Sequence, residues 1–182
     1  MNLIKTKIND LVILQPTIFN DNRGSFMESY NQKNIKNLLG NVNFVQENQS
    51  ESSKGVLRGL HFQKPPFAQS KLVRCISGTV LDVALDLRKD SKTYGCFEKT
   101  ILSDDNKKQL FIPKGFAHGF VVLSNFAILI YKVDNYYNPQ FESGILWNDP
   151  YLNIDWKLKK TEVIISEKDQ KLSTFNNFIS PF

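Results

Sequence analysis

The segment 79–88 alternates between apolar and polar side chains, and this pattern limits the possible folds of the chain more than any other feature. Its odd positions are mostly apolar and its even positions include three charged residues: Thr79, Leu81, Val83, Leu85 and Leu87 against Asp82, Asp86 and Arg88. Successive side chains of a strand point to opposite faces, so a period of two indicates a β-strand with one apolar and one mostly polar face. The segment therefore predicts a sheet.

Short apolar segments separated by turn residues recur along the chain. Two of these turns predict β-hairpins: 71–76 with 79–87 around Ser77-Gly78, and 119–123 with 126–133 around Ser124-Asn125. Another turn signal at 21–24 precedes a short strand candidate at 25–30. Several short strands at regular spacing predict an all-β sandwich or small barrel.

Helix signals are rare. The best candidate is 31–39, where Ile35, Leu38 and Leu39 have helical spacing and Gly40 follows as a stop. We therefore expect short helices at the periphery of a β-fold.

The length of 182 residues predicts one domain over 1–182. A chain of this size buries roughly 70% of its unfolded surface, which allows a sizeable core. Its 41% hydrophobic and 12% aromatic content argues against disorder. From about residue 151 the composition is more polar and mixed, and we expect this C-terminal tail to pack on the outside of the strands.

The charge distribution gives little support for a nucleic-acid partner. The net charge is +5, but the densest basic cluster is only Lys157, Lys159 and Lys160, which we interpret as solvated surface. The first residues lack the apolar block of a signal peptide, and no stretch approaches the ~20 apolar residues of a membrane span. These observations predict a cytoplasmic protein with no membrane partner.

Two histidines and two cysteines narrow the possible chemistry. Cys75 and Cys96 have neither disulfide-framework nor metal-binding spacing, and Cys75 reads as a core residue. His61 has Gln63, not a second histidine, two residues on, so we expect no metal. Gly-rich phosphate loops and serine-nucleophile motifs are absent. Histidine, tyrosine and several cations together suit proton transfer on an anionic substrate.

Strand parity raises one conflict and one open question. His61 shares a strand face with Gly59, whereas Arg58 should point to the other face unless Gly59 hosts a bulge or a partner subunit contributes. Tyr131 shares a face with Leu129 and should point into the interior. There it is either a core tyrosine with a satisfied hydroxyl or a proton donor at the floor of a pocket.

Nine segments, in order and at fixed spacing, identify a family. They are Asp21-x-Arg23-Gly24-x-Phe26-x-Glu28, Phe44-Val45-Gln46-Glu47-Asn48, Gly55-Val56-Leu57-Arg58-Gly59-Leu60-His61-Phe62-Gln63, Gln69-x-Lys71-Leu72-Val73, Asp82-Val83-Ala84-Leu85-Asp86-Leu87-Arg88, Ile112-Pro113-x-Gly115-Phe116-Ala117-His118-Gly119-Phe120, Tyr131-Lys132, Trp147-Asn148-Asp149-Pro150 and Ser166-Glu167-Lys168-Asp169. From about residue 3 to about residue 170, the chain resembles the dTDP-4-dehydrorhamnose 3,5-epimerase family of cupin-like enzymes.

The resemblance implies a cupin-type jelly-roll barrel, a homodimer and no metal or other cofactor. It implies an isomerase that converts dTDP-4-keto-6-deoxy-D-glucose to dTDP-4-keto-L-rhamnose, in deoxysugar biosynthesis. By the family's pattern His61 is the general base and Asp169 supports it. Tyr131 is the general acid on the opposite ring face, and Lys71 stabilises the enolate oxygen. The candidates for binding nucleotide or sugar are Arg23, Phe26, Glu28, Gln46, Asn48, Arg58, Gln63, His118, Glu142 and Lys168.

The residue types fit that chemistry. Carbons 3 and 5 flank the C4 ketone, so loss of a proton from either places negative charge on the ketone oxygen, which a fixed cation stabilises. Inversion requires a proton to leave one face and arrive at the other, hence two separate groups.

Three alternatives stay open at this stage. Single-site C3 or C5 epimerases on related nucleotide 4-keto sugars keep much the same histidine and tyrosine. A non-catalytic cupin that binds a nucleotide sugar is the second alternative, and an iron-dependent cupin oxygenase is the third. Phe26, Tyr136 and Tyr137 are candidates for stacking on the nucleotide base.

Overall fold

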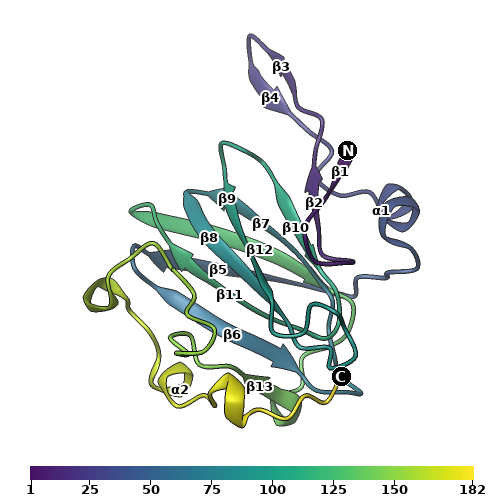
Figure 1. Cartoon of the computed structure of the whole chain (residues 1–182). Coiled ribbons are helices and arrows are strands. Elements are labelled where there is room, and N and C mark those ends of the chain that lie inside the picture. The colour runs from purple at the N-terminus through teal and green to yellow at the C-terminus, as the bar shows by residue number, and fades with distance from the viewer.

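The computed structural model describes residues 1–182, and most of its strands form two facing antiparallel sheets (Figure 1). The six-stranded sheet has the order β1 (Asn2–Lys5), β2 (Val12–Gln15), β10 (Gln109–Ile112), β7 (Lys71–Ser77), β12 (Phe126–Val133) and β5 (Gln46–Ser53). The five-stranded sheet has the order β13 (Glu142–Gly144), β6 (Leu57–Gln63), β11 (Phe116–Val122), β8 (Thr79–Asp86) and β9 (Phe97–Ser103). The all-β prediction is confirmed.

The remaining elements are short and peripheral. Strands β3 (Phe19–Asp21) and β4 (Gly24–Phe26) form a separate hairpin that projects beyond the sheets in Figure 1. Helix α1 (Gln32–Leu39) matches the expected one, with Asn31 capping its start and Gly40 its end. Helix α2 (Glu167–Gln170) is a single turn, and the 3₁₀ turns are η1 (Pro139–Phe141), η2 (Lys160–Glu162) and η3 (Phe175–Asn177).

Both predicted hairpins around Ser77-Gly78 and Ser124-Asn125 are wrong. The turns exist, but β7 lies in the six-stranded sheet and β8 in the five-stranded one, and the same holds for β12 and β11. Gly78 has φ +79°, and a Cβ there would lie 2.1 Å from the Phe126 carbonyl oxygen, so the chain passes between sheets in little space. Turn residues encode a reversal but not the sheet that the next strand joins.

Both faces of β8 are buried, although its sequence alternates between apolar and polar side chains. Val80 and Ala84 belong to the core between the two sheets, together with Cys75. Leu81 and Leu85 point to the opposite side and belong to a second core. The polar positions of this strand are therefore enclosed, and Asp82 and Asp86 are each 0% exposed.

The C-terminal tail supplies the other half of that second core. Ile154, Trp156 and Phe175 pack with Leu81 and Leu85 on the outer face of the five-stranded sheet. A third, smaller core lies on the outer face of the six-stranded sheet, where Ile35 of α1 packs on strand residues. The core between the two sheets is thus flanked by a further apolar core on the outer face of each sheet.

Asp86 anchors the connection after β8, and we expect its loss to destabilise the fold. Its carboxylate accepts hydrogen bonds from Arg88, Ser91 and Thr93. Asp86→Asn should lower the free energy of unfolding by about 1–3 kcal/mol, because it removes the charged acceptor of several buried hydrogen bonds, while Arg88 keeps its ion pair with Asp10. Urea denaturation of the wild type and the variant measures this difference, and equal midpoints would contradict it.

The same carboxylate predicts a pH dependence. Burial would raise the pKa of Asp86, but hydrogen bonds from Arg88, Ser91 and Thr93 hold it below its ordinary value of 3.8. Its stabilisation is complete above that ordinary pKa and is lost as the pH falls through the lowered one. The stability gap between wild type and Asp86→Asn should therefore narrow only at strongly acidic pH.

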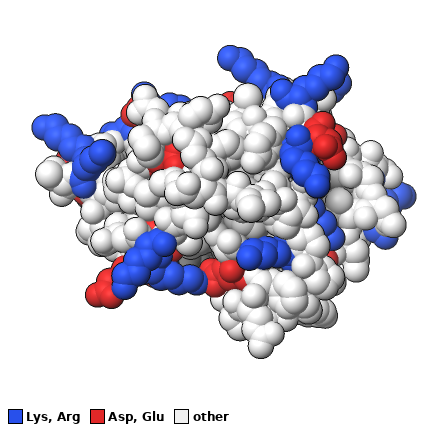
Figure 2. All heavy atoms as spheres, turned by 60° about the horizontal axis from the view of Figure 1, so that its bottom comes forward, with Lys and Arg blue, Asp and Glu red and all other residues white.

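None of the helices combines the length and the apolar character that crossing a bilayer requires. On the face shown in Figure 2, lysine and arginine side chains stand apart, several of them beside acidic groups, and they form no continuous basic surface. Within the densest basic cluster of the sequence, Lys157 pairs with Asp155.

Candidate active site

A bulge in β6 places Arg58 and His61 on one cavity. His61 is paired with His118 of β11, and Arg58 with Phe120, so Gly59 and Leu60 together face the single residue between them. Gly59 has φ +113°, and a Cβ there would lie 2.6 Å from the His118 carbonyl oxygen. Only glycine fits this close approach. Of the two explanations that parity allowed for Arg58, the structure shows the bulge.

His61, which is partly exposed, pairs with the buried Asp169 from α2. The distance from His61 Nε2 to Asp169 Oδ1 is 2.7 Å, and the Gly59 backbone N–H donates to Asp169 Oδ2 at 3.2 Å. Ser166 begins this helical turn and accepts a hydrogen bond from the Asp169 N–H. Burial alone would raise the pKa of Asp169, but hydrogen bonds from His61 and Gly59 hold it below the ordinary value. The pair therefore joins an imidazole to a charged acceptor.

The pair opens onto a cavity of about 700 Å³ between the sheets. A neighbouring hollow of about 300 Å³ shares residues with it, so the two form one site. The residues common to both are His61, Lys71, Tyr131 and Asn48. Of the four proposed catalytic residues, Lys71 and Tyr131 come from the six-stranded sheet, whereas His61 and its partner Asp169 lie on the side of the five-stranded sheet.

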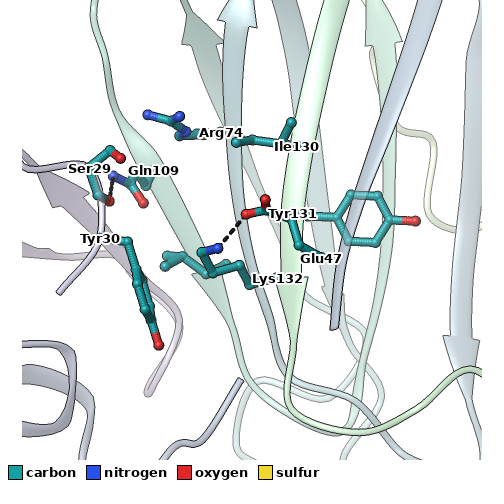
Figure 3. A pocket seen from close by; sticks show the side chains of 9 residues that line it. Ser29, Tyr30, Glu47, Arg74, Gln109, Ile130, Tyr131 and Lys132 are labelled. Atoms are coloured by element: carbon teal, nitrogen blue, oxygen red, sulfur yellow. Dashed lines mark hydrogen bonds and ion pairs between the residues drawn. The ribbon is translucent and has the colours of Figure 1, made fainter. Parts of the chain in front are cut away.

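Tyr131 points into this space, as parity predicted. Figure 3 shows its ring projecting away from Glu47, Arg74 and Lys132, which lie on the outer face of the same sheet. Burial raises the pKa of the Tyr131 hydroxyl, against the opposing effect of Arg58. No hydrogen bond within the protein uses that hydroxyl, so the fold itself supplies it with no partner. The group is protonated at neutral pH and free to donate.

Lys71 lies beside Tyr131, with its ammonium 5.9 Å from the centre of the ring. Burial lowers the pKa of Lys71 to about 8, while the Asp82 and Glu142 carboxylates oppose a further fall. The lysine is therefore mostly cationic at neutral pH. It forms no close ion pair, which leaves its charge available to the cavity.

Seven of the ten binding candidates gather around this cavity: Gln46, Asn48, Arg58, Gln63, His118, Glu142 and Lys168. Arg58 is held by the Ser52 hydroxyl, which accepts from its Nε at 3.1 Å. Glu142 pairs with Lys168 and accepts from the Tyr137 hydroxyl. Gln63 differs from the rest, because its side-chain amide is already hydrogen-bonded to backbone groups of Phe67, Tyr136 and Asn138. It therefore joins the segments around residues 67 and 136–138 at the cavity wall.

The other three binding candidates lie elsewhere. Arg23 and Phe26 belong to the projecting hairpin, with the Phe26 side chain 70% exposed and Arg23 paired with Asp21. Glu28 accepts hydrogen bonds from Asn31 and Asn34 at the start of α1. None of the three lines the cavity of its own chain.

Sequence reasoning missed one buried acidic residue. This residue is Asp82 of β8, and its Oδ2 lies 2.9 Å from the Nε2 of His118. The alternation of β8 placed this carboxylate on the polar face, but nothing in the sequence pairs it with a histidine 36 residues away. The structure contains no group of three or more His, Cys, Asp or Glu side chains that could hold a metal ion.

A two-sheet β-barrel with a histidine–aspartate pair on one wall and a tyrosine and a lysine on the other defines a cupin-like proton-transfer enzyme. The model of the dTDP-4-dehydrorhamnose 3,5-epimerase family matches residues 5–177. The chain belongs to this family, and its cupin-like fold is that of the family's solved structures.

Individual relatives agree over nearly the whole chain. The dTDP-4-dehydrorhamnose 3,5-epimerase of Escherichia coli K12 is 52% identical over 180 residues, which cover 98% of this chain and 97% of that protein. The crystal structure of the enzyme of that name from Elizabethkingia anophelis has a TM-score of 0.94 at 50% identity, and covers 97% of each chain. The Legionella pneumophila 3,5-epimerase, solved with dTDP-4-keto-L-rhamnose, has a TM-score of 0.93 at 47% identity, covering 98% of this chain and 94% of that one.

Proposed function

We propose that this chain is an isomerase that inverts C3 and C5 of dTDP-4-keto-6-deoxy-D-glucose to give dTDP-4-keto-L-rhamnose. The observation that carries the proposal is the placement of His61 and Tyr131 on facing sheets, across one cavity. A base and an acid on opposite walls can take a proton from one face of a sugar ring and return one to the other. The family to which the chain belongs and the sugar nucleotide bound by the Legionella relative support the same substrate.

In this proposal each proton transfer belongs to a particular atom. An ionised Asp169 can only accept, so the facing His61 Nε2 carries the hydrogen and Nδ1 is the basic nitrogen. His61 removes the proton next to the ketone, and the resulting enolate oxygen is stabilised by the Lys71 ammonium. Tyr131 then donates its proton from the other wall. Charge stabilisation of this kind is strong where the groups are already in place before the charge develops.

The cations around the cavity match the rest of the substrate. Arg58 and Lys168 border it, and a diphosphate needs such donors to offset its charge. Small-molecule recognition therefore accounts for basic residues that composition alone could have assigned to nucleic acid.

The configuration of the product tests this proposal. Purified protein is incubated with dTDP-4-keto-6-deoxy-D-glucose, and proton NMR reads the configuration at C3 and C5. Inversion at both carbons is expected. Inversion at one carbon would make the chain a single-site epimerase, and binding without inversion would make it a non-catalytic nucleotide-sugar protein.

We further propose that the protein is a homodimer in which the β3–β4 hairpin of one subunit completes the site of the other. Arg23 and Phe26 are exposed and lie away from the cavity of their own chain. The outer face of the six-stranded sheet is also only partly covered: Ile76 is 39% and Phe126 is 49% exposed. This face carries exposed apolar side chains together with both acidic and basic ones, among them Glu47, Arg74 and Lys132, and such a mixed surface can be self-complementary across a two-fold axis.

Complementation between two inactive variants tests the shared site. Arg23→Glu should damage the partner's site, and His61→Asn the chain's own site. Mixing and re-equilibrating the two variants should restore about a quarter of wild-type activity, since half of the dimers then have one intact site. No recovery, with subunit exchange verified by mass spectrometry, would show that the hairpin serves its own subunit.

A further inference from the structure

A second histidine–aspartate pair lies beside the first. His118 and Asp82 occupy adjacent strands β11 and β8, with 2.9 Å between Nε2 and Oδ2. His118 is also the cross-strand partner of His61. Both side chains of the second pair are buried, and the His118 ring lines the cavity.

Asp82 is poorly satisfied for a structural residue. Its side chain is 0% exposed, His118 is its one hydrogen-bond partner, and Oδ1 has none. Asp86 lies four residues further along the same strand, on the same face. It is equally buried but accepts hydrogen bonds from three side chains. A buried carboxylate with a single partner is costly, and such groups concentrate at functional sites. Asp82 therefore has a task beyond holding the strands together.

The pair determines which His118 nitrogen faces the cavity as an acceptor. An ionised carboxylate only accepts hydrogen bonds, so Nε2 carries the hydrogen in a neutral ring and Nδ1 keeps its lone pair. Nδ1 has no hydrogen-bond partner within the protein, and the His118 side chain lines the cavity. Burial lowers the pKa of His118, Asp82 opposes this, and the charges of Lys71 and His61 lower it again. The neutral form is thus favoured.

We propose that Asp82 is a positioning residue that fixes His118 with an unprotonated Nδ1 toward the cavity, where it accepts a hydrogen bond from a hydroxyl of the sugar. This inference rests on the proposed function and makes it more specific. A lone pair attracts a hydroxyl donor and repels phosphate oxygens, so His118 recognises the sugar and not the diphosphate. The diphosphate is left to cations such as Arg58 and Lys168.

Imidazole NMR tests the tautomer without turnover. The chain has two histidines, so ¹⁵N-labelled protein gives two ring systems, and His61→Asn identifies them. At neutral pH the His118 ring should have a protonated Nε2 and an unprotonated Nδ1. Asp82→Asn should shift the Nε2–H signal of His118 and leave that of His61 in place. A protonated Nδ1 in the wild type would overturn the proposal.

Kinetics and binding test the consequence. Asp82→Asn should reduce kcat/KM about 10-fold, the effect of losing one positioned hydrogen bond. In a His118→Asn background the same change should cost less than about twofold, because the two residues act as one unit. Affinity for dTDP, which has no sugar on its diphosphate, should be unchanged. A loss of dTDP affinity that equals the loss in kcat/KM would place His118 on the phosphates and refute the inference.

Thr100→Val is the matched control. Thr100 is the cross-strand neighbour of Asp82, is buried and has no hydrogen-bond partner of its own. This variant should retain wild-type kcat/KM and His118 signals. If Thr100→Val lowered kcat/KM as much as Asp82→Asn does, the loss in Asp82→Asn would be attributed to altered packing. If the wild type does not convert the substrate, the proposed function fails, while the NMR and dTDP measurements still decide the role of Asp82.

Discussion

His61→Asn should reduce epimerisation to below about a hundredth of the wild-type rate, since a positioned general base contributes roughly 10²- to 10⁴-fold. Asparagine keeps a polar side chain of similar size beside Asp169 but offers no basic nitrogen. Proton loss from the substrate should fall equally, because the first step itself is removed. Solvent exchange of the C3 and C5 protons, followed by NMR, measures that step separately from product formation.

The neighbouring histidine provides the control for this variant. His118→Asn removes an imidazole from the paired strand position, and we expect only about a 10-fold loss in kcat/KM with exchange still detectable. If the two variants lost exchange to the same degree, the assignment of the base to His61 would be unsupported. Wild-type dTDP affinity in His61→Asn would show that its cavity is still formed.

Tyr131→Phe should separate the two halves of the reaction. Removal of the hydroxyl leaves His61, Asp169 and Lys71 in place, so proton loss continues while protonation on the opposite face slows by about 10²-fold or more. The ratio of exchange to inversion should therefore rise relative to the wild type. NMR of one reaction in heavy water gives both quantities.

Tyr94→Phe is the matched control, because Tyr94 packs against Phe175 in the outer core and is remote from the cavity lining. Its conversion rate should stay within about twofold of the wild type, as is usual for a change outside the site. Normal inversion of both centres by Tyr131→Phe would show that another group is the acid.

The sequence predicts the strands of this fold better than their arrangement. Alternation located β8, and capping residues located α1 to within one residue. The two hairpin predictions failed because a glycine turn serves equally within a sheet and between sheets, and only tertiary packing chooses. The predicted strand at 25–30 is shorter in the structure, ending at Phe26, since the following residues pair with no neighbour.

The site was predictable in its residue types and only partly in its geometry. Parity placed Tyr131 toward the interior and showed that Gly59 had to break the strand or a second subunit had to contribute, and the structure contains that break. The association of His61 with Asp169 joins positions 108 residues apart, so the resemblance supplied it and periodicity could not. For the pairing of Asp82 with His118, the sequence offered only an aspartate on the polar face of a predicted strand.

Conversion of dTDP-4-keto-6-deoxy-D-glucose by the wild type in heavy water, followed by NMR of the product, tests double epimerisation most directly. Deuterium is expected at both C3 and C5 in a product inverted at both carbons, and no label above background is expected with His61→Asn. Label at one carbon alone would contradict double epimerisation. Inversion without solvent label would contradict proton transfer by His61 and Tyr131 as the mechanism.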